Sequence, residues 1–128
     1  MKVLLDTHSL IWAAIYPAKL SRKAASIIED DSNVILVSAA SAWEIATKVR
    51  LGRLAGAEHF ELNFMDRVHA AGYSLRHISV EDGLRAGRLT GDHQDPFDRM
   101  IAAQALADDI PVISIDAKLD LFGIRRIW

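Results

Sequence analysis

The sequence contains no cysteine, which excludes a disulfide framework, zinc sites built from thiolates and cysteine nucleophiles. No apolar run approaches the roughly 18 residues that a membrane-spanning helix needs. The N-terminal apolar run, residues 3–5, is too short for a secretory signal peptide and is closed by Asp6. We therefore expect a cytoplasmic protein without a membrane segment.

Neither sign of charge is in large excess, because 15 basic residues face 17 acidic ones and the net charge is −2. A negative balance on its own argues against a nucleic-acid partner. Four acidic residues considered below account for that sign, since without them 13 acidic residues would face the 15 basic ones. The charge permits a nucleic-acid substrate but does not indicate one.

Linkers, internal repeats and low-complexity stretches are also missing from the 128 residues. A hydrophobic content of 51% with 25% charged residues is typical of a folded globular protein, not a disordered one. The length suits one core of ordinary size. We expect a single domain over residues 1–128.

Short, continuous apolar runs alternate with segments that carry helix start and stop signals. The expected strands cover residues 2–5, 34–37, 73–78, 112–115 and 124–127. The expected helices cover residues 9–15, 21–28, 57–71, 79–89 and 95–108, with one more that begins at 38 or 41 and ends near 50. This alternation is typical of an α/β fold with a parallel sheet covered on both faces.

Four acidic residues stand where such a fold could direct them toward one point. Asp6 and Asp116 each end a predicted strand, and sites in open parallel sheets form beyond the carboxyl ends of strands. Glu44 interrupts an apolar segment, and Asp98 opens a predicted helix. Clustered carboxylates repel one another unless cations occupy the cluster, and hard oxygen ligands select Mg²⁺ or Mn²⁺. The pattern predicts metal-dependent phosphodiester chemistry.

Each acid also has an ordinary structural explanation. Asp6 and Asp116 could cap the segments that follow them. Glu44 precedes Lys48 by four residues, the favourable order for an ion pair on a helix. Asp98 would be favoured by the helix dipole in any first turn. The coincidence of all four is what favours a shared site.

Several neighbours are secondary candidates. Thr7 and Ser114 carry hydroxyls beside the acids and could orient a carboxylate or a metal-bound water. Asp95 is a weaker candidate because a capping role explains it well. His93 could contact phosphate or a metal-bound water, although a solvated loop histidine is the more ordinary interpretation, and His8 is similar.

Basic and aromatic residues could serve an RNA substrate. A nuclease needs cations that hold phosphates, and a solvated face is the alternative for the basic candidates; these are Lys48, Arg50, Arg53, Arg85, Arg88 and Arg99. Trp43 could stack on a base, but its apolar neighbours favour a place in the core. The five histidines include no H-x-x-x-H pair, which disfavours a zinc site.

Four segments together resemble the PIN-domain ribonucleases, and in particular the VapC class of type II toxins. They are Asp6-Thr7-His8, Ser41-Ala42-Trp43-Glu44-Ile45, His93-Gln94-Asp95-Pro96-Phe97-Asp98-Arg99 and Ser114-Ile115-Asp116. The resemblance covers essentially the whole chain, and the Asp-Pro-Phe-Asp-Arg block is its most specific part. Ser114 stands where the family usually has threonine, which keeps the hydroxyl.

The resemblance implies a three-layer α/β/α domain with a central parallel sheet. It places the family's four catalytic, metal-binding acids on Asp6, Glu44, Asp98 and Asp116. It further implies an endoribonuclease that depends on Mg²⁺, with Mn²⁺ as a substitute, forms homodimers and is inhibited by a small antitoxin protein that occludes the site.

Other function classes remain open. A phosphatase of similar topology needs a second aspartate where this chain has His8, and a receiver domain needs an acidic pair near the first strand that is absent here. A housekeeping PIN nuclease without a toxin role is a closer alternative. A module that binds RNA or protein without catalysis is another, and it should be indifferent to a chelator.

Overall fold

A five-stranded, wholly parallel sheet forms the centre of the molecule in the computed structural model, which describes residues 1–128. The strands are β1 (Lys2–Leu5), β2 (Val34–Ser38), β3 (Ser74–Arg76), β4 (Val112–Ile113) and β5 (Arg126–Ile127), in the order β3-β2-β1-β4-β5. Every neighbouring pair is parallel. The predicted α/β class with a parallel sheet is confirmed.

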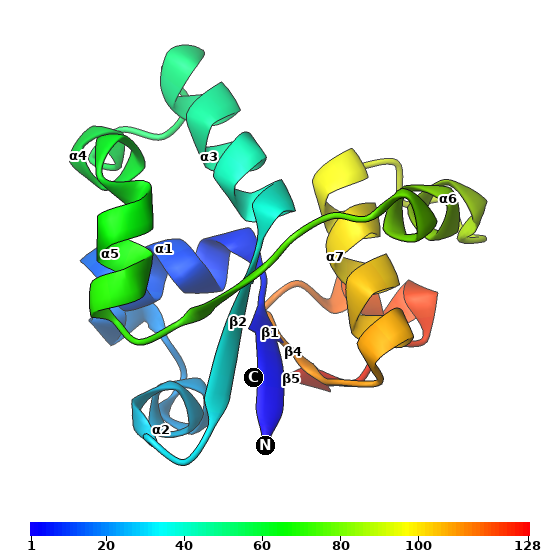
Figure 1. The fold of residues 1–128 in the computed structure, drawn as a ribbon, viewed down its shortest axis with the longest axis horizontal. Coiled ribbons are helices and arrows are strands. Elements are labelled where there is room, and N and C mark those ends of the chain that lie inside the picture. The colour runs from blue at the N-terminus through cyan, green and yellow to red at the C-terminus, as the bar shows by residue number, and fades with distance from the viewer.

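Helices cover both faces of this sheet (Figure 1). They are α1 (Thr7–Ile15), α2 (Arg22–Glu29), α3 (Ala39–Arg50), α4 (Glu58–Leu62), α5 (Phe64–Ala70), α6 (Val80–Arg88) and α7 (Pro96–Asp108), with two 3₁₀ helices, η1 (Pro17–Lys19) and η2 (Ala117–Phe122). In Figure 1 the first, second, fourth and fifth helices lie to the left of the sheet, and α6 and α7 lie to the right. No helix is both long enough and apolar enough to span a bilayer.

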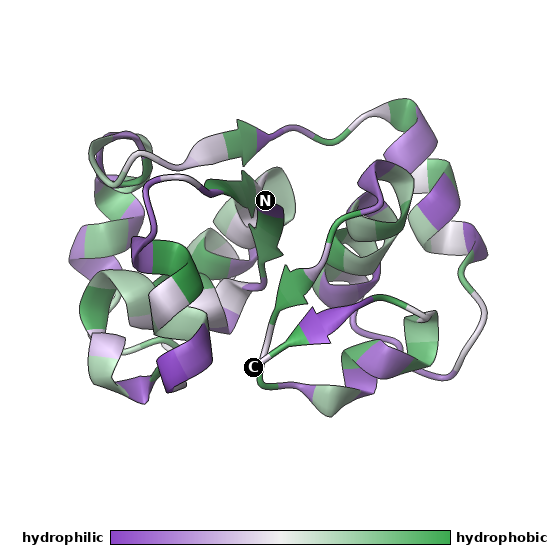
Figure 2. Cartoon of the chain, turned by 90° about the horizontal axis from the view of Figure 1, so that it is seen from below, coloured by the Kyte–Doolittle hydropathy of each residue, from purple (hydrophilic) through white to green (hydrophobic).

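The alternation of side chains along β1 separates two hydrophobic cores. Val3 and Leu5 point into the core shared with α1, α2, α4 and α5. Leu4 points the other way, into the core shared with α7 and η2. Because both faces of the strand are buried at residues 3–5, all three of these positions are apolar, and Figure 2 shows the central strands in hydrophobic green.

The structure corrects several predicted bounds. The predicted helix 57–71 is two helices, because the Asn63 side-chain amide donates to the His59 carbonyl at 2.8 Å and the Asn63 backbone leaves helical geometry. The strands predicted at 73–78, 112–115 and 124–127 are shorter than expected, and neither 3₁₀ helix was predicted. Strand β4 ends early because the Ser114 hydroxyl accepts the Asp116 N–H at 2.9 Å and turns the chain.

Two short strand-to-helix connections and the start of α7 determine where the site lies. Asp6 follows β1 directly and caps α1, and Ser38 both ends β2 and caps α3. Leu5 pairs with Ile113, so the carboxyl ends of β1 and β4 lie side by side. Asp95 caps α7 through the N–H groups of Phe97 and Asp98. Strands β1, β2 and β4 thus end, and helices α1, α3 and α7 begin, at the same edge of the sheet.

Candidate metal and active site

All four predicted acids line one pocket of about 190 Å³ beyond the carboxyl ends of β1 and β4. The complete lining is Asp6, Thr7, His8, Glu44, Lys48, His93, Asp95, Asp98, Ile115, Asp116 and Lys118. The acids come from four different places in the chain, which explains why the sequence shows them as isolated residues. Carboxylates in such numbers in one pocket favour a bound cation.

Asp6 is the most enclosed of the acids that a strand delivers, with 4% of its surface exposed. One carboxylate oxygen accepts the Ser9 N–H at 2.8 Å, which caps α1, and the other accepts the Ser114 hydroxyl at 2.5 Å. Burial raises the pKa of Asp6 above its ordinary value, against the opposing effect of these hydrogen bonds. Asp6 is therefore a helix cap and a pocket acid at once.

Glu44 is equally buried but less well satisfied. It is 4% exposed, and its Oε2 accepts the Lys48 ammonium, the ion pair expected from their spacing. Its Oε1 is buried and has no hydrogen-bond partner. An unsatisfied buried carboxylate oxygen costs free energy, so the pocket around Glu44 is suited to a cation or a donor that completes it.

Asp98 is partly buried in the first turn of α7. Burial raises its pKa to about 6; the hydrogen bond with His93 lowers it, and the charges of Asp95 and Glu44 raise it further. These two like charges oppose the ionisation of Asp98. A cation in the pocket would relieve that repulsion.

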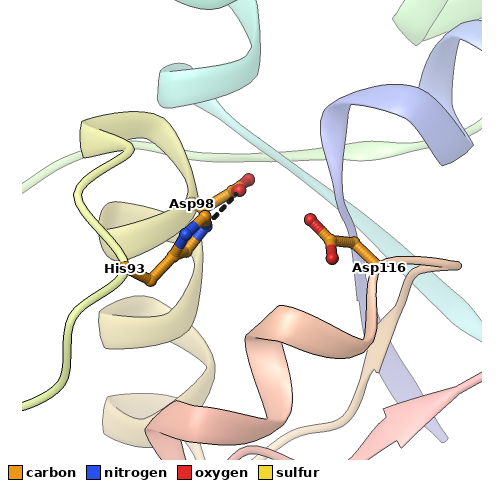
Figure 3. A group of neighbouring side chains, drawn as sticks. All are labelled: His93, Asp98 and Asp116. Carbon is orange, nitrogen blue, oxygen red and sulfur yellow. Dashed lines mark hydrogen bonds and ion pairs between the residues drawn. The ribbon is translucent and has the colours of Figure 1, made fainter.

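His93 and Asp116 complete the pocket on the side of α7 and η2. His93 Nε2 lies 2.7 Å from Asp98 Oδ2, and one ligand atom from each of His93, Asp98 and Asp116 lies within 4.8 Å of the others (Figure 3). The expectation of a solvated His93 is wrong, because only 14% of its side chain is exposed. Its place five residues before Asp98, in the loop that leads into the helix cap, is the sequence signal for this.

The secondary candidates have different surroundings. The Ser114 hydroxyl joins two of the acids, since it donates to Asp6 and accepts the Asp116 N–H. Thr7 lines the pocket, and its hydroxyl shares a hydrogen bond of 3.0 Å with Ser41 of α3. Asp95 lines the pocket while it caps α7.

Arg99 does not line the pocket. Its guanidinium donates to the backbone carbonyls of Ala86 at 3.1 Å, His93 at 3.0 Å and Leu89, and it lies over the Phe122 ring. These bonds fasten the loop between α6 and α7 to α7. The cations at the pocket are instead Lys48 and Lys118.

Trp43 is not a core residue as expected, because 59% of it is exposed. Adjacent residues on a helix point about 100° apart, and α3 turns Glu44 inward, which leaves Trp43 outside. Its ring packs edge-on against Phe97 with the ring centres 4.7 Å apart. The residues preceding Glu44 and Asp98 thus hold the two acid-bearing helices together.

The profile of the PIN domain family matches residues 3–124 of this chain. The chain belongs to the PIN domain family. The resemblance noted in the sequence is confirmed at this level, and the pocket described above lies within the matched PIN residues.

A named relative extends the comparison. Ribonuclease VapC16 of Mycobacterium tuberculosis is 47% identical over 63 residues, which cover 49% of this chain and 43% of that protein. The chain therefore spans less than half the length of this curated relative in the match.

Solved structures share the fold over nearly the full length. VapBC2 of Rickettsia felis, bound to a promoter DNA fragment, superposes with a TM-score of 0.71 at 13% identity, covering 100% of this chain and 99% of that chain. VapC20 of Mycobacterium tuberculosis, a toxin that cleaves the sarcin-ricin loop, gives 0.60 at 16% identity, with 95% of each chain covered. At these identities the likeness concerns the fold alone, and it agrees with the three-layer α/β/α architecture.

Proposed function

We propose that this PIN domain is a metal-dependent endoribonuclease and the toxin of a toxin–antitoxin pair. The observation that carries the proposal is the buried, unpartnered Glu44 Oε1 in a pocket lined by three further predicted acids. The name of the relative VapC16, a ribonuclease, supports the reaction class. We further propose that residues 1–128 act as one domain.

The residues of the pocket fit a hard divalent cation. Oxygen atoms of Asp6, Glu44, Asp98 and Asp116 would hold Mg²⁺, with Mn²⁺ as a substitute. Bound there, the cation supplies Lewis acidity, which lowers the pKa of an attacking water and offsets negative charge on the phosphate. In the resulting hydrolysis water adds to phosphorus and the bond to the 3′ oxygen breaks, which leaves a 3′-hydroxyl and a 5′-phosphate.

The chain's own side chains prepare the pocket for that reaction. Ser114 fixes the orientation of Asp6 through its hydroxyl. Lys48 and Lys118 line the same pocket and would hold the RNA backbone by charge, without reading its sequence. The closed packing around Asp6 and Glu44 keeps water away from one side of both carboxylates.

The shared fold and the acidic pocket also suggest which partners to expect. Solved neighbours include FitAcB of Neisseria gonorrhoeae and VapBC-1 of nontypeable Haemophilus influenzae, whose fold this chain shares. We propose an antitoxin that occludes the pocket and neutralises its acids with a basic side chain, a homodimer of this chain, and action in the cytoplasm, where the RNA is.

The purified chain should cleave RNA in the presence of Mg²⁺ or Mn²⁺ and leave 5′-phosphate ends. Asp6→Asn should lower the rate by roughly 100-fold or more, because it removes a charge that the cation requires. Rates can be measured on end-labelled RNA, with the ends identified by phosphatase treatment.

The exposed Asp31 offers a matched control, since Asp31→Asn makes the same chemical change outside the pocket and should leave the rate unchanged. Fragments that persist in chelator and end in 2′,3′-cyclic phosphate would count against the proposal. Metal-independent binding of RNA without cleavage would indicate the non-catalytic module instead.

A further inference from the structure

His93 is oriented toward the acids of the pocket. Its Nε2 lies 2.7 Å from Asp98 Oδ2, and Asp116 presents its carboxylate to the same space (Figure 3). The imidazole is thus the one nitrogen donor in the group whose ligand atoms lie within 4.8 Å of one another. The carboxylates supply only oxygen.

A second observation in the same pocket favours a bound cation. Glu44 lines the same pocket, is almost completely buried and leaves Oε1 without a partner. A hydrogen bond between His93 and Asp98 alone would leave Glu44 Oε1, which belongs to helix α3, without a partner. A cation shared by the pocket would satisfy both.

Two further contacts restrict the position of His93. Its backbone carbonyl accepts the Arg99 guanidinium at 3.0 Å, and its ring lies 5.8 Å from the Phe122 ring, centre to centre. Metal-binding histidines need this kind of support, because a ring that rotates freely loses entropy when it binds. Arg99, which contacts no acid of the pocket, thereby has a positioning role.

The spacing suits six-coordinate ligation. Neighbouring ligands of an octahedral ion with bonds of about 2.1 Å lie about 3 Å apart, and opposite ligands lie about 4.2 Å apart. The distance of 2.7 Å between His93 and Asp98 is close to a neighbouring pair, and the 4.8 Å limit for the three ligand atoms exceeds an opposite pair only slightly. A small closure of the pocket would bring all three onto one ion.

We propose that His93 is a nitrogen ligand of the metal site, so that the site holds a first-row transition ion such as Mn²⁺ more tightly than Mg²⁺. The inference rests on the proposed function, which supplies the metal, and adds to it a ligand and a metal preference. Imidazole binds transition ions well, whereas Mg²⁺ prefers oxygen and retains its water.

Pulsed electron paramagnetic resonance of the Mn²⁺-loaded chain tests this directly, because a bound imidazole nitrogen gives a ¹⁴N coupling. We expect the coupling in the wild type and in His69→Gln, an exposed histidine, and its loss in His93→Gln. His8→Gln should keep the coupling although His8 also lines the pocket. Loss of the signal in His8→Gln but not in His93→Gln would overturn the assignment.

Calorimetric titration supplies an independent readout. His93→Gln should weaken Mn²⁺ binding by roughly tenfold or more and change Mg²⁺ binding much less. Equal losses for both ions, or Mn²⁺ bound without ¹⁴N coupling, would show that His93 only hydrogen-bonds to Asp98 and would overturn this inference while leaving the nuclease proposal intact. Failure of the wild type to bind either ion would instead defeat the proposed function. Thermal unfolding of each variant shows that it is folded.

Discussion

The Asp98 side chain is 21% exposed, and its carboxyl group has a pKa of about 6 against 3.8 for an unperturbed one. The folded metal-free protein therefore binds this proton more tightly than the unfolded chain. The corresponding stability is fully present below pH 4 and is lost as the pH rises through 6. The partly buried Asp98 carboxylate therefore destabilises the metal-free protein at neutral pH, and a bound cation would offset this cost.

Compared with the wild type, metal-free Asp98→Asn should therefore gain more stability at pH 7 than at pH 4. The shift corresponds to about 1–2 kcal/mol after allowance for the partly exposed side chain. Urea unfolding in chelator at both pH values measures the difference, with Asp31→Asn as the control that should follow the wild type. Parallel profiles for Asp98→Asn and the wild type would refute the explanation.

The sequence predicted the ordinary role of single residues well, but it did not show that some of these residues have a second role. Asp6 and Asp95 do cap helices, as their ordinary explanations required, and both also line the pocket. An aspartate side chain has two carboxylate oxygens, and in Asp6 only one of them caps the helix. A cap and a place in the pocket are therefore not alternatives, which local sequence signals could not reveal.

At the scale of elements, the buried amide of Gln104 on α7 connects three neighbours. Its Oε1 accepts the Ser38 hydroxyl at 2.6 Å, and its Nε2 donates to the His77 carbonyl at 3.1 Å and to Asp82 Oδ2 at 3.3 Å. Since Ser38 caps α3, the network joins the helix that carries Asp98 to the helix that carries Glu44. Asp82 is in turn paired with Arg76 at the end of β3.

Gln104→Leu should lower the free energy of unfolding by about 1–3 kcal/mol, because it leaves the buried Ser38 hydroxyl without an acceptor and removes one donor from the His77 carbonyl and one from Asp82. Chemical denaturation gives the value. Gln94→Leu makes the same change at an exposed loop position and should cost little. If the two variants lose equal stability, the network does not hold the helices together.

The sequence predicted the elements but not this network. Apolar runs and helix caps are local, so the order of strands and helices could be read from them. The bond between Ser38 and Gln104 joins residues 66 positions apart, and no local signal in either segment points to the other. For the same reason the sequence left open whether Arg99 holds phosphate or lies on a solvated face, and did not reveal that it binds the carbonyls of the loop between α6 and α7.

On the scale of the whole molecule, the acids lie in a pocket at one edge of the sheet, and Lys48 and Lys118 share it. The net charge of −2 hid this arrangement, since it sums a buried acidic pocket and a scaffold of the opposite sign. Such a pocket binds cations whether they are metal ions or the basic side chains of another protein. Under the proposed function, regulation by a partner would thus need no site other than this pocket.

If the chain is a toxin, its expression alone should arrest growth of the host, because the exposed residues His8 and Lys118 line the pocket and make it accessible to a substrate from solvent. Asp6→Asn should relieve the arrest at equal protein level, and so should co-expression of a small protein encoded beside it. Asp31→Asn, which leaves the pocket intact, should arrest growth as the wild type does. Growth curves together with the pattern of RNA fragments decide the matter. Harmless expression of a folded wild type that cleaves RNA in vitro would exclude the toxin role and leave a housekeeping PIN nuclease, whereas arrest by Asp6→Asn as well would place the toxicity outside the pocket.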